Sequence, residues 1–195
     1  SASAARAYIK RFPDDSNAPL MYQSIIKAYT KGGFPIRVWE EKEQFIASYA
    51  TAFTHATPEG AKTVRVSTAV TDANKVAVAR WLQQYLEELS HFYYVLAQKK
   101  TTEALSSNIN KASNDSNTSS DGTPSELYVK AGGYYRVLVT AFPAAEKVGE
   151  NSFLAAESFY KAGQLEKAIE DYEFAAYKTG HHSYALEAGY AAVLT

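Results

Sequence analysis

The chain has 195 residues, of which 46% are hydrophobic and 21% are charged, a composition typical of a folded globular domain. Its formal net charge of -1, with Lys and Arg scattered along the chain, gives no electrostatic indication of nucleic-acid binding. The absence of cysteine excludes disulfides, thiol catalysis and Cys-ligated zinc. No apolar run of about 18 residues predicts a transmembrane segment.

The first part of the chain predicts two helices joined by a polar turn. One covers residues 2–12 and ends there, because Pro13 cannot continue a helix. The next covers residues 18–31 and ends before Gly33, since glycine adopts the left-handed conformation of a helix end without steric cost. We therefore expect a helix hairpin at the start of the chain.

A third helix and a much longer one follow. Pro35 fits the first turn of a helix, where the missing amide hydrogen costs nothing, and the charged run 40–43 (EEKE) indicates a solvated face on that helix. Residues 55–72 are interpreted as a loop; within it, 63–70 could form a short strand, but a loop fits an all-helical chain better. Apolar residues then cover much of the circumference of 73–99, which indicates a long helix packed on more than one side.

A polar segment separates this long helix from the next. Residues 106–123 contain almost no apolar side chains, so they bury too little surface to offset the entropy of ordering. We expect a flexible inserted loop there. Residues 124–142 then predict a helix that ends in Phe-Pro, as the first one does.

The C-terminal part carries the pattern of a helical repeat. Small and aromatic residues alternate at helical spacing from 153 to 190. Gly163 ends one helix, a second follows at once and ends at Gly180, and residues 181–194 begin a third. Ala168 is small at a point where two helices must approach closely. A non-repeating antiparallel helix pair would give a similar pattern.

An internal copy argues for the repeat. Residues 1–49 align with residues 131–179 at a constant shift of 130 and without a gap, so that the first Phe-Pro pair falls on the second and Gly33 falls on Gly163. Gapless internal similarity over this length is typical of repeat architectures.

The copies resemble the tetratricopeptide repeat (TPR), a helix-turn-helix of about 34 residues. The positions that match are Gly163, Leu165, Ala168, Tyr172 and Ala175. The chain departs from the family in having Gly180 where Pro is usual, and Ala155 and Ala156 where Leu and Gly are typical. The resemblance implies an all-α fold, a TPR-like right-handed solenoid of about eight helices stacked as antiparallel hairpins. We expect residues 1–195 to form one such domain, as a fragment of a longer protein.

Two stretches, YIKRFPDDSNAP and KAYTKGGFP, are similar to envelope TPR proteins of Gram-negative bacteria. The Phe-Pro helix ends also resemble those of the TPR lipoprotein in the outer-membrane β-barrel assembly machine. This resemblance implies a periplasmic or outer-membrane-associated location and a scaffold role. A lipid anchor would then lie outside this chain, which has no lipoprotein cysteine.

No pattern of residues predicts catalysis. The four histidines lack metal-binding spacing, and His181-His182 indicates a solvated turn. The charged residues of 166–171 form i,i+4 pairs typical of a helix exterior. Nucleotide-binding and nucleophile-elbow motifs do not occur. We expect no enzyme, no catalytic or metal site and no cofactor.

In TPR arrays the first helix of each hairpin lines a concave face, and this position assigns the candidate partner-binding residues. They are Leu20, Gln23, Lys27, Thr30 and Lys31 in the first copy, and Phe153, Glu157, Tyr160, Lys161, Tyr184 and Glu187 in and after the second. Such a mixture of aromatic and charged side chains suits an extended peptide or a helix.

The leading functional hypothesis is therefore a non-enzymatic adaptor of the bacterial cell envelope that binds a protein or peptide partner. An alternative is a structural helical-repeat segment that packs against other domains of a larger enzyme or of a secretion or assembly complex. A third hypothesis, a carbohydrate-handling accessory module, has the many tyrosines as its only support.

Overall fold

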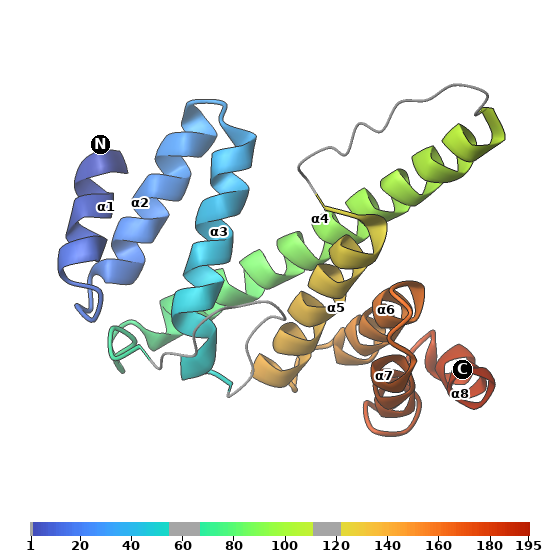
Figure 1. The fold of residues 1–195 in the computed structure, drawn as a ribbon. Helices are drawn as coiled ribbons and strands as arrows, with labels where there is room; N and C mark the ends of the chain where they lie inside the picture. The colour runs from blue at the N-terminus through green and yellow to red at the C-terminus, as the bar shows by residue number, and fades with distance from the viewer. Residues whose placement is uncertain (1, 55–66, 111–121) are drawn as a thin grey trace. The chain divides into compact units, whose positions relative to one another are not determined.

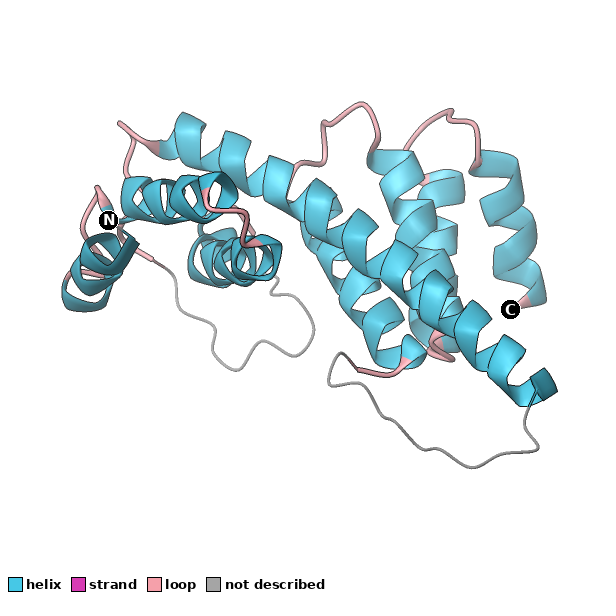
Figure 2. Ribbon diagram, turned by 90° about the horizontal axis from the view of Figure 1, so that it is seen from above, coloured by secondary structure: helices cyan, strands magenta, loops and turns pink. Residues whose placement is uncertain are grey.

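The computed structural model describes residues 2–54, 67–110 and 122–195. In these ranges the chain is all-α, with eight α-helices, one short 3-10 helix and no strand (Figure 2). The elements are α1 (Ala2–Arg11), α2 (Ala18–Lys31), α3 (Pro35–Tyr49), η1 (Ala50–Ala52), α4 (Lys75–Asn110), α5 (Pro124–Ala141), α6 (Val148–Lys161), α7 (Leu165–Tyr177) and α8 (Ala185–Leu194). None of the helices in the described ranges is long and apolar enough to cross a membrane. The expected all-α class is confirmed.

The chain divides into two compact units, residues 1–89 and residues 90–195. The long helix α4 contributes its first part to unit 1 and its remainder to unit 2 (Figure 1). That the whole chain forms one TPR-like repeat domain stays a prediction.

Unit 1 has an aromatic core. Helices α1, α2 and α3 follow one another in space as in sequence, each packed against the next (Figure 1). Phe45 of α3 is fully buried, and four rings surround it at centroid distances of 4.8–6.4 Å. These rings are those of Tyr22, Tyr49, Trp81 and Tyr85. Edge-to-face pairs of this kind are each worth about 0.5–1.5 kcal/mol beyond the area they bury.

The charged run of α3 is less solvated than its composition suggested. Glu40 is exposed, but Glu41 and Lys42 retain only 3% and 8% of their accessible surface. Lys42 pairs with Glu88 of α4, and its ammonium nitrogen lies 4.6 Å from the centroid of the Trp39 ring. Buried charges require such partners. The prediction of a solvated face is therefore wrong for Glu41 and Lys42.

In unit 2 each helix from α5 to α8 packs against the next. The core between α6, α7 and α8 centres on Phe159 and Tyr172, with exposures of 0% and 2%, and on small residues that let the helices approach. Ala168 is one of these and is fully buried, as the sequence predicted. Truncating a side chain such as Phe159 to Ala typically costs 3–5 kcal/mol.

The two copies have matching local structure. Helices α2 and α6 each have 14 residues and are offset by 130, and α3 and α7 begin at the same offset. Gly33 and Gly163 close the preceding helices with positive φ angles of 72° and 78°. In both turns the residue after this glycine donates its amide hydrogen to the carbonyl of the residue five positions earlier. The gapless alignment is confirmed for helix bounds and turns, whereas the superhelical arrangement of a TPR array stays a prediction.

Helix α4 is longer than predicted, because it continues to Asn110. The first residues of the expected loop at 106–123 are therefore helical, while residues 111–121 lie outside the described ranges. Polar side chains support this extension: the hydroxyl groups of Thr101, Thr102 and Ser106 donate to carbonyls four residues earlier.

Two further boundaries differ from those predicted. Helix α8 begins at Ala185 rather than at 181, because residues 178–184 form the connection after α7, with Gly180 in the left-handed conformation. Of the alternative strand at 63–70, residues 67–70 form turn and loop, and 63–66 lie outside the described ranges.

Candidate functional site

Five of the predicted partner-binding residues lie along α6 or beside it in unit 2. The ring of Phe153 stacks on that of Tyr184, with centroids 4.8 Å apart and planes 6° from parallel. Tyr184 is the residue immediately before α8, so the turn after α7 brings it to α6. Phe153 also contacts Tyr172 of α7 at a centroid distance of 5.8 Å. The two neighbouring helices thus fix the position of Phe153.

One turn further along α6, Glu157 connects two hydrogen-bond donors. Its carboxylate accepts from the ammonium of Lys161 at 2.6 Å and from the hydroxyl of Tyr172 at 2.5 Å. Burial raises the pKa of Tyr172 and the Glu157 carboxylate raises it further, so the hydroxyl stays protonated and donates. Burial is the largest single effect on Lys161 and lowers its pKa, but the hydrogen bond and charge of Glu157, together with the effect of Tyr94, outweigh it and the pKa is raised. Lys161 therefore keeps its charge.

Tyr160 adds an exposed ring to the same side of α6. It lies seven residues after Phe153 and three after Glu157, a spacing that shares a helix face, and 50% of its surface is accessible. We call the set Phe153, Glu157, Tyr160, Lys161 and Tyr184 the α6 surface. Glu187 is exposed in the first turn of α8. The structure thus brings five of the six candidates in and after the second copy together, with two aromatic rings and one ion pair held in place.

The candidates of the first copy are less uniform. Lys27 and Lys31 are exposed on α2, as a binding role would require. Gln23 is only 8% exposed, and its side-chain amide donates to the hydroxyl of Tyr85 on α4 at 2.5 Å. Burial raises the pKa of Tyr85 to about 12. Gln23 therefore stabilises the packing of α2 against α4 and does not lie on an exposed surface.

A charged pair that sequence reasoning missed recurs in both copies. Arg6 of α1 donates to the carboxylate of Glu41 on α3. At the constant shift of 130, Arg136 of α5 donates through Nε to Oδ2 of Asp171 on α7 at 2.7 Å. The side chain of Asp171 is only 15% exposed. The prediction that the charges of 166–171 solubilise a helix exterior is therefore wrong for Asp171.

The surroundings of the two arginines differ. Arg136 also donates to the Lys167 carbonyl at 2.9 Å and to Glu170 at 3.0 Å, and its guanidinium lies 4.7 Å from the Phe159 ring centroid. Burial raises the pKa of Asp171 to about 6, because Arg136 offsets this effect only in part. In the first copy Tyr29 stands at the sequence position of Phe159, and its hydroxyl accepts from Arg6 at 3.4 Å.

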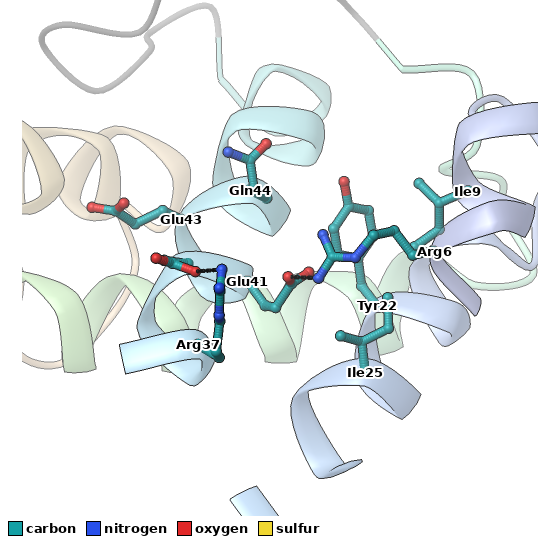
Figure 3. A pocket seen from close by; sticks show the side chains of 9 residues that line it. Arg6, Ile9, Tyr22, Ile25, Arg37, Glu41, Glu43 and Gln44 are labelled. Atoms are coloured by element: carbon teal, nitrogen blue, oxygen red, sulfur yellow. Dashed lines mark hydrogen bonds and ion pairs between the residues drawn. The ribbon is translucent and has the colours of Figure 1, made fainter. Parts of the chain in front are cut away.

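A cleft of about 290 Å³ lies beside the pair of the first copy. Figure 3 shows Arg6 and Glu41 pointing toward one another across it, with Arg37 on the far side of Glu41. Arg37 and Glu40 form an exposed i,i+3 ion pair at 2.9 Å. The cleft lies entirely in unit 1, between α1 and α3, and Tyr22 and Ile25 of α2 line it as well.

The histidine that sequence reasoning placed in a solvated turn has a structural contact. The Nε2 atom of His182 lies 2.8 Å from the Ala175 carbonyl, and its ring lies against Gly149, where a side chain would clash with it. The prediction of solvation is wrong for His182. Within the described ranges, no group of three His, Asp or Glu residues is arranged to hold a metal ion.

Comparison of the chain with protein-family models, with curated proteins and with solved structures found no match. The similarity to TPR proteins therefore stays an expectation from sequence. Two features of the described residues are suited to binding: the α6 surface and the charged cleft between α1 and α3.

Proposed function

We propose that this chain is a non-enzymatic interaction scaffold that holds a partner protein or peptide on the α6 surface. The supporting observation is that residues predicted from their repeat position share one face and have fixed partners. Tyrosine is enriched at the energetic centres of protein interfaces, because its ring buries a large area while its hydroxyl finds a polar partner. Tyr160 is the exposed anchor on this face.

The α6 surface is well ordered before any partner arrives. The Phe153–Tyr184 stack and the contacts of Glu157 restrict these side chains in the free protein. A partner would thus avoid part of the ordering cost, which is about 0.5–1.5 kcal/mol for each immobilised side chain. Since Glu157 and Lys161 offset each other in charge, we propose a partner segment that presents apolar and neutral polar groups, in extended or helical form.

The proposed setting is the periplasm or outer membrane of a Gram-negative bacterium, where the chain would act as an adaptor. This part of the proposal rests on the sequence resemblance of the Phe-Pro and Gly-Gly-Phe-Pro segments.

The test is capture of a partner from envelope extract, followed by titration of that purified partner against the parent chain and variants. Tyr160→Ala should weaken binding about tenfold or more, the loss expected for an interface anchor. Tyr177→Ala, which removes an equally large and 67% exposed ring from α7, is the matched control and should bind as the parent does. Equal affinities for the parent and Tyr160→Ala would contradict the proposal.

One observation favours the alternative of a structural segment that packs against a neighbouring domain. Leu186, Tyr190 and Val193 on α8 are 87%, 69% and 81% exposed, and their spacing of four and three residues places them on one helix face. Exposed apolar patches commonly mark interfaces. If Leu186→Lys abolishes partner binding and Tyr160→Ala does not, this alternative replaces the first proposal.

A further inference from the structure

The second copy shows which chemical group the acidic pair on the third helix of each copy can bind. On α7 the consecutive residues Glu170 and Asp171 both accept from the guanidinium of Arg136, at 3.0 and 2.7 Å. The same guanidinium also donates to the Lys167 carbonyl at 2.9 Å. One planar cation thus satisfies three acceptors of a single helix, a geometry that arginine provides and lysine does not.

The first copy also has two consecutive acidic residues here, but they pair with two different cations. Glu40 and Glu41 stand at the positions of Glu170 and Asp171. Arg6 donates to Glu41 and to the hydroxyl of Tyr29. Glu40 pairs instead with Arg37 from its own helix, at 2.9 Å.

The cleft between α1 and α3 lies at this point (Figure 3). Its volume of about 290 Å³ is at the small end for ligand sites, so it suits a single side chain better than a large ligand. Three glutamates and two arginines line it, so acidic side chains outnumber basic ones in its lining. Ile9 and Tyr22 supply apolar surface for the methylene groups of a long cationic side chain.

Displacing Arg37 from Glu40 would cost little. Their side chains are 62% and 49% exposed, and surface ion pairs of this type contribute roughly 0–1 kcal/mol. A carboxylate also has room for more than one donor.

We infer that the cleft receives an arginine side chain of a partner protein. The guanidinium of this arginine binds Glu40 and the Arg37 carbonyl, as Arg136 binds Glu170 and the Lys167 carbonyl in the second copy. The inference rests on the proposed scaffold function, but its site lies in unit 1, whereas the α6 surface lies in unit 2.

The test is an NMR titration of the whole ¹⁵N-labelled chain with N-acetyl-arginine N-methylamide. The uncharged citrulline analogue, which has nearly the same shape, is the control probe. We expect saturable shifts of the α3 amides near Glu40 with the arginine probe and none with citrulline. The dissociation constant should be on the order of millimolar, because one side chain supplies all the contacts.

Variants test the assignment. Glu40→Gln should weaken binding of the arginine probe about fivefold. Glu170→Gln removes the equivalent carboxylate of the second copy, which Arg136 already occupies, and should leave binding unchanged. Arg37→Ala should strengthen binding by releasing Glu40, whereas Lys27→Ala, which removes the same charge from α2, should not.

Several results would overturn the inference: no saturable shift, equal shifts with citrulline, or unaltered binding by Glu40→Gln in a chain whose spectrum stays dispersed. Because the probe is a small molecule, this test does not depend on finding a partner. Failure of the cleft can thus be told apart from failure of the α6 surface, which Tyr160→Ala examines separately.

Discussion

Replacing Asp171 with Asn tests whether burial or the neighbouring arginine controls this carboxyl group. Asp171 is 15% exposed at its side chain and bonded to Arg136. Burial raises its pKa from the ordinary value of 3.8 to about 6, against the lowering effect of Arg136. We therefore expect the folded protein to bind the Asp171 proton more tightly than the unfolded chain does.

The size of the effect follows from this shift. A change of roughly 2 pKa units corresponds to about 3 kcal/mol at 1.36 kcal/mol per unit. Since the folded pKa is raised, the stabilisation from Asp171 is fully present below about pH 4, is lost progressively as the pH rises from 4 to 6, and is absent above that. The contribution of Asp171 to the free energy of unfolding should therefore fall by about 3 kcal/mol across this window in the parent. That component should be missing in Asp171→Asn.

Urea unfolding followed by far-ultraviolet circular dichroism, at several pH values from 3.5 to 7.5 for parent and variant, measures this difference. Carbon NMR of the Asp171 carboxyl gives its midpoint directly. In Arg136→Gln the midpoint should rise further, because a group that lowers the pKa has been removed. A midpoint near or below 4 in the parent would refute the reasoning, since it would mean that the ion pair outweighs burial.

Three further substitutions test the packing of unit 2. Gly132→Ala should destabilise the protein by about 1–2 kcal/mol in urea unfolding, because the new methyl would lie 2.9 Å from the Phe159 ring. This overpacking outweighs the gain in helix propensity. A stabilised variant would show that the ring moves aside freely. Gly163→Ala should lower the stability by about 1–2 kcal/mol in thermal unfolding, because alanine is strained at a φ of 78°. No neighbouring atom would contact the methyl, so this strain is the whole effect. An unchanged melting temperature would contradict the left-handed conformation. Tyr172→Phe should lower the free energy of unfolding by about 1.5–3 kcal/mol, because it removes a hydrogen bond to the Glu157 carboxylate. A double-mutant cycle with Glu157→Gln should show coupling between the two residues, and additive effects would contradict the bond.

Local signals in the sequence predicted most helices well. Helix α2 has the predicted bounds of 18–31, because a polar turn precedes it and two glycines follow it. Helix α4 was underestimated, since the stretch from 100 to 110 is polar and its hydroxyls find backbone acceptors only once the helix exists. Local pattern cannot reveal support of that kind.

The recurring ion pairs could have been found by a closer use of the internal copy. The shift of 130 that relates Gly33 to Gly163 also places Arg6 on Arg136 and an acidic residue on Asp171. The pairing itself joins helices that are 35 residues apart, which helical spacing does not predict. For the same reason, charges that suggested a solvated surface turned out to be partly buried.

The burial of Gln23 shows another limit. Its position aligns with Phe153, and the repeat predicted a partner-binding residue at both places, but Gln23 packs against a neighbouring helix instead. Whether the side chain at this repeat position stays accessible depends on which other helix of the unit packs beside it. In unit 1 that helix is α4, whose Tyr85 accepts the Gln23 amide. Residue type and spacing alone did not supply this information.

The division into two units has a spectroscopic consequence. The chain contains two tryptophans, Trp39 and Trp81, and both belong to unit 1. Indole emission therefore reports on the folding of unit 1, while the far-ultraviolet dichroism of the helices reports on both units. Any interval of denaturant concentration in which the two signals disagree would contain molecules with one unit folded and the other unfolded.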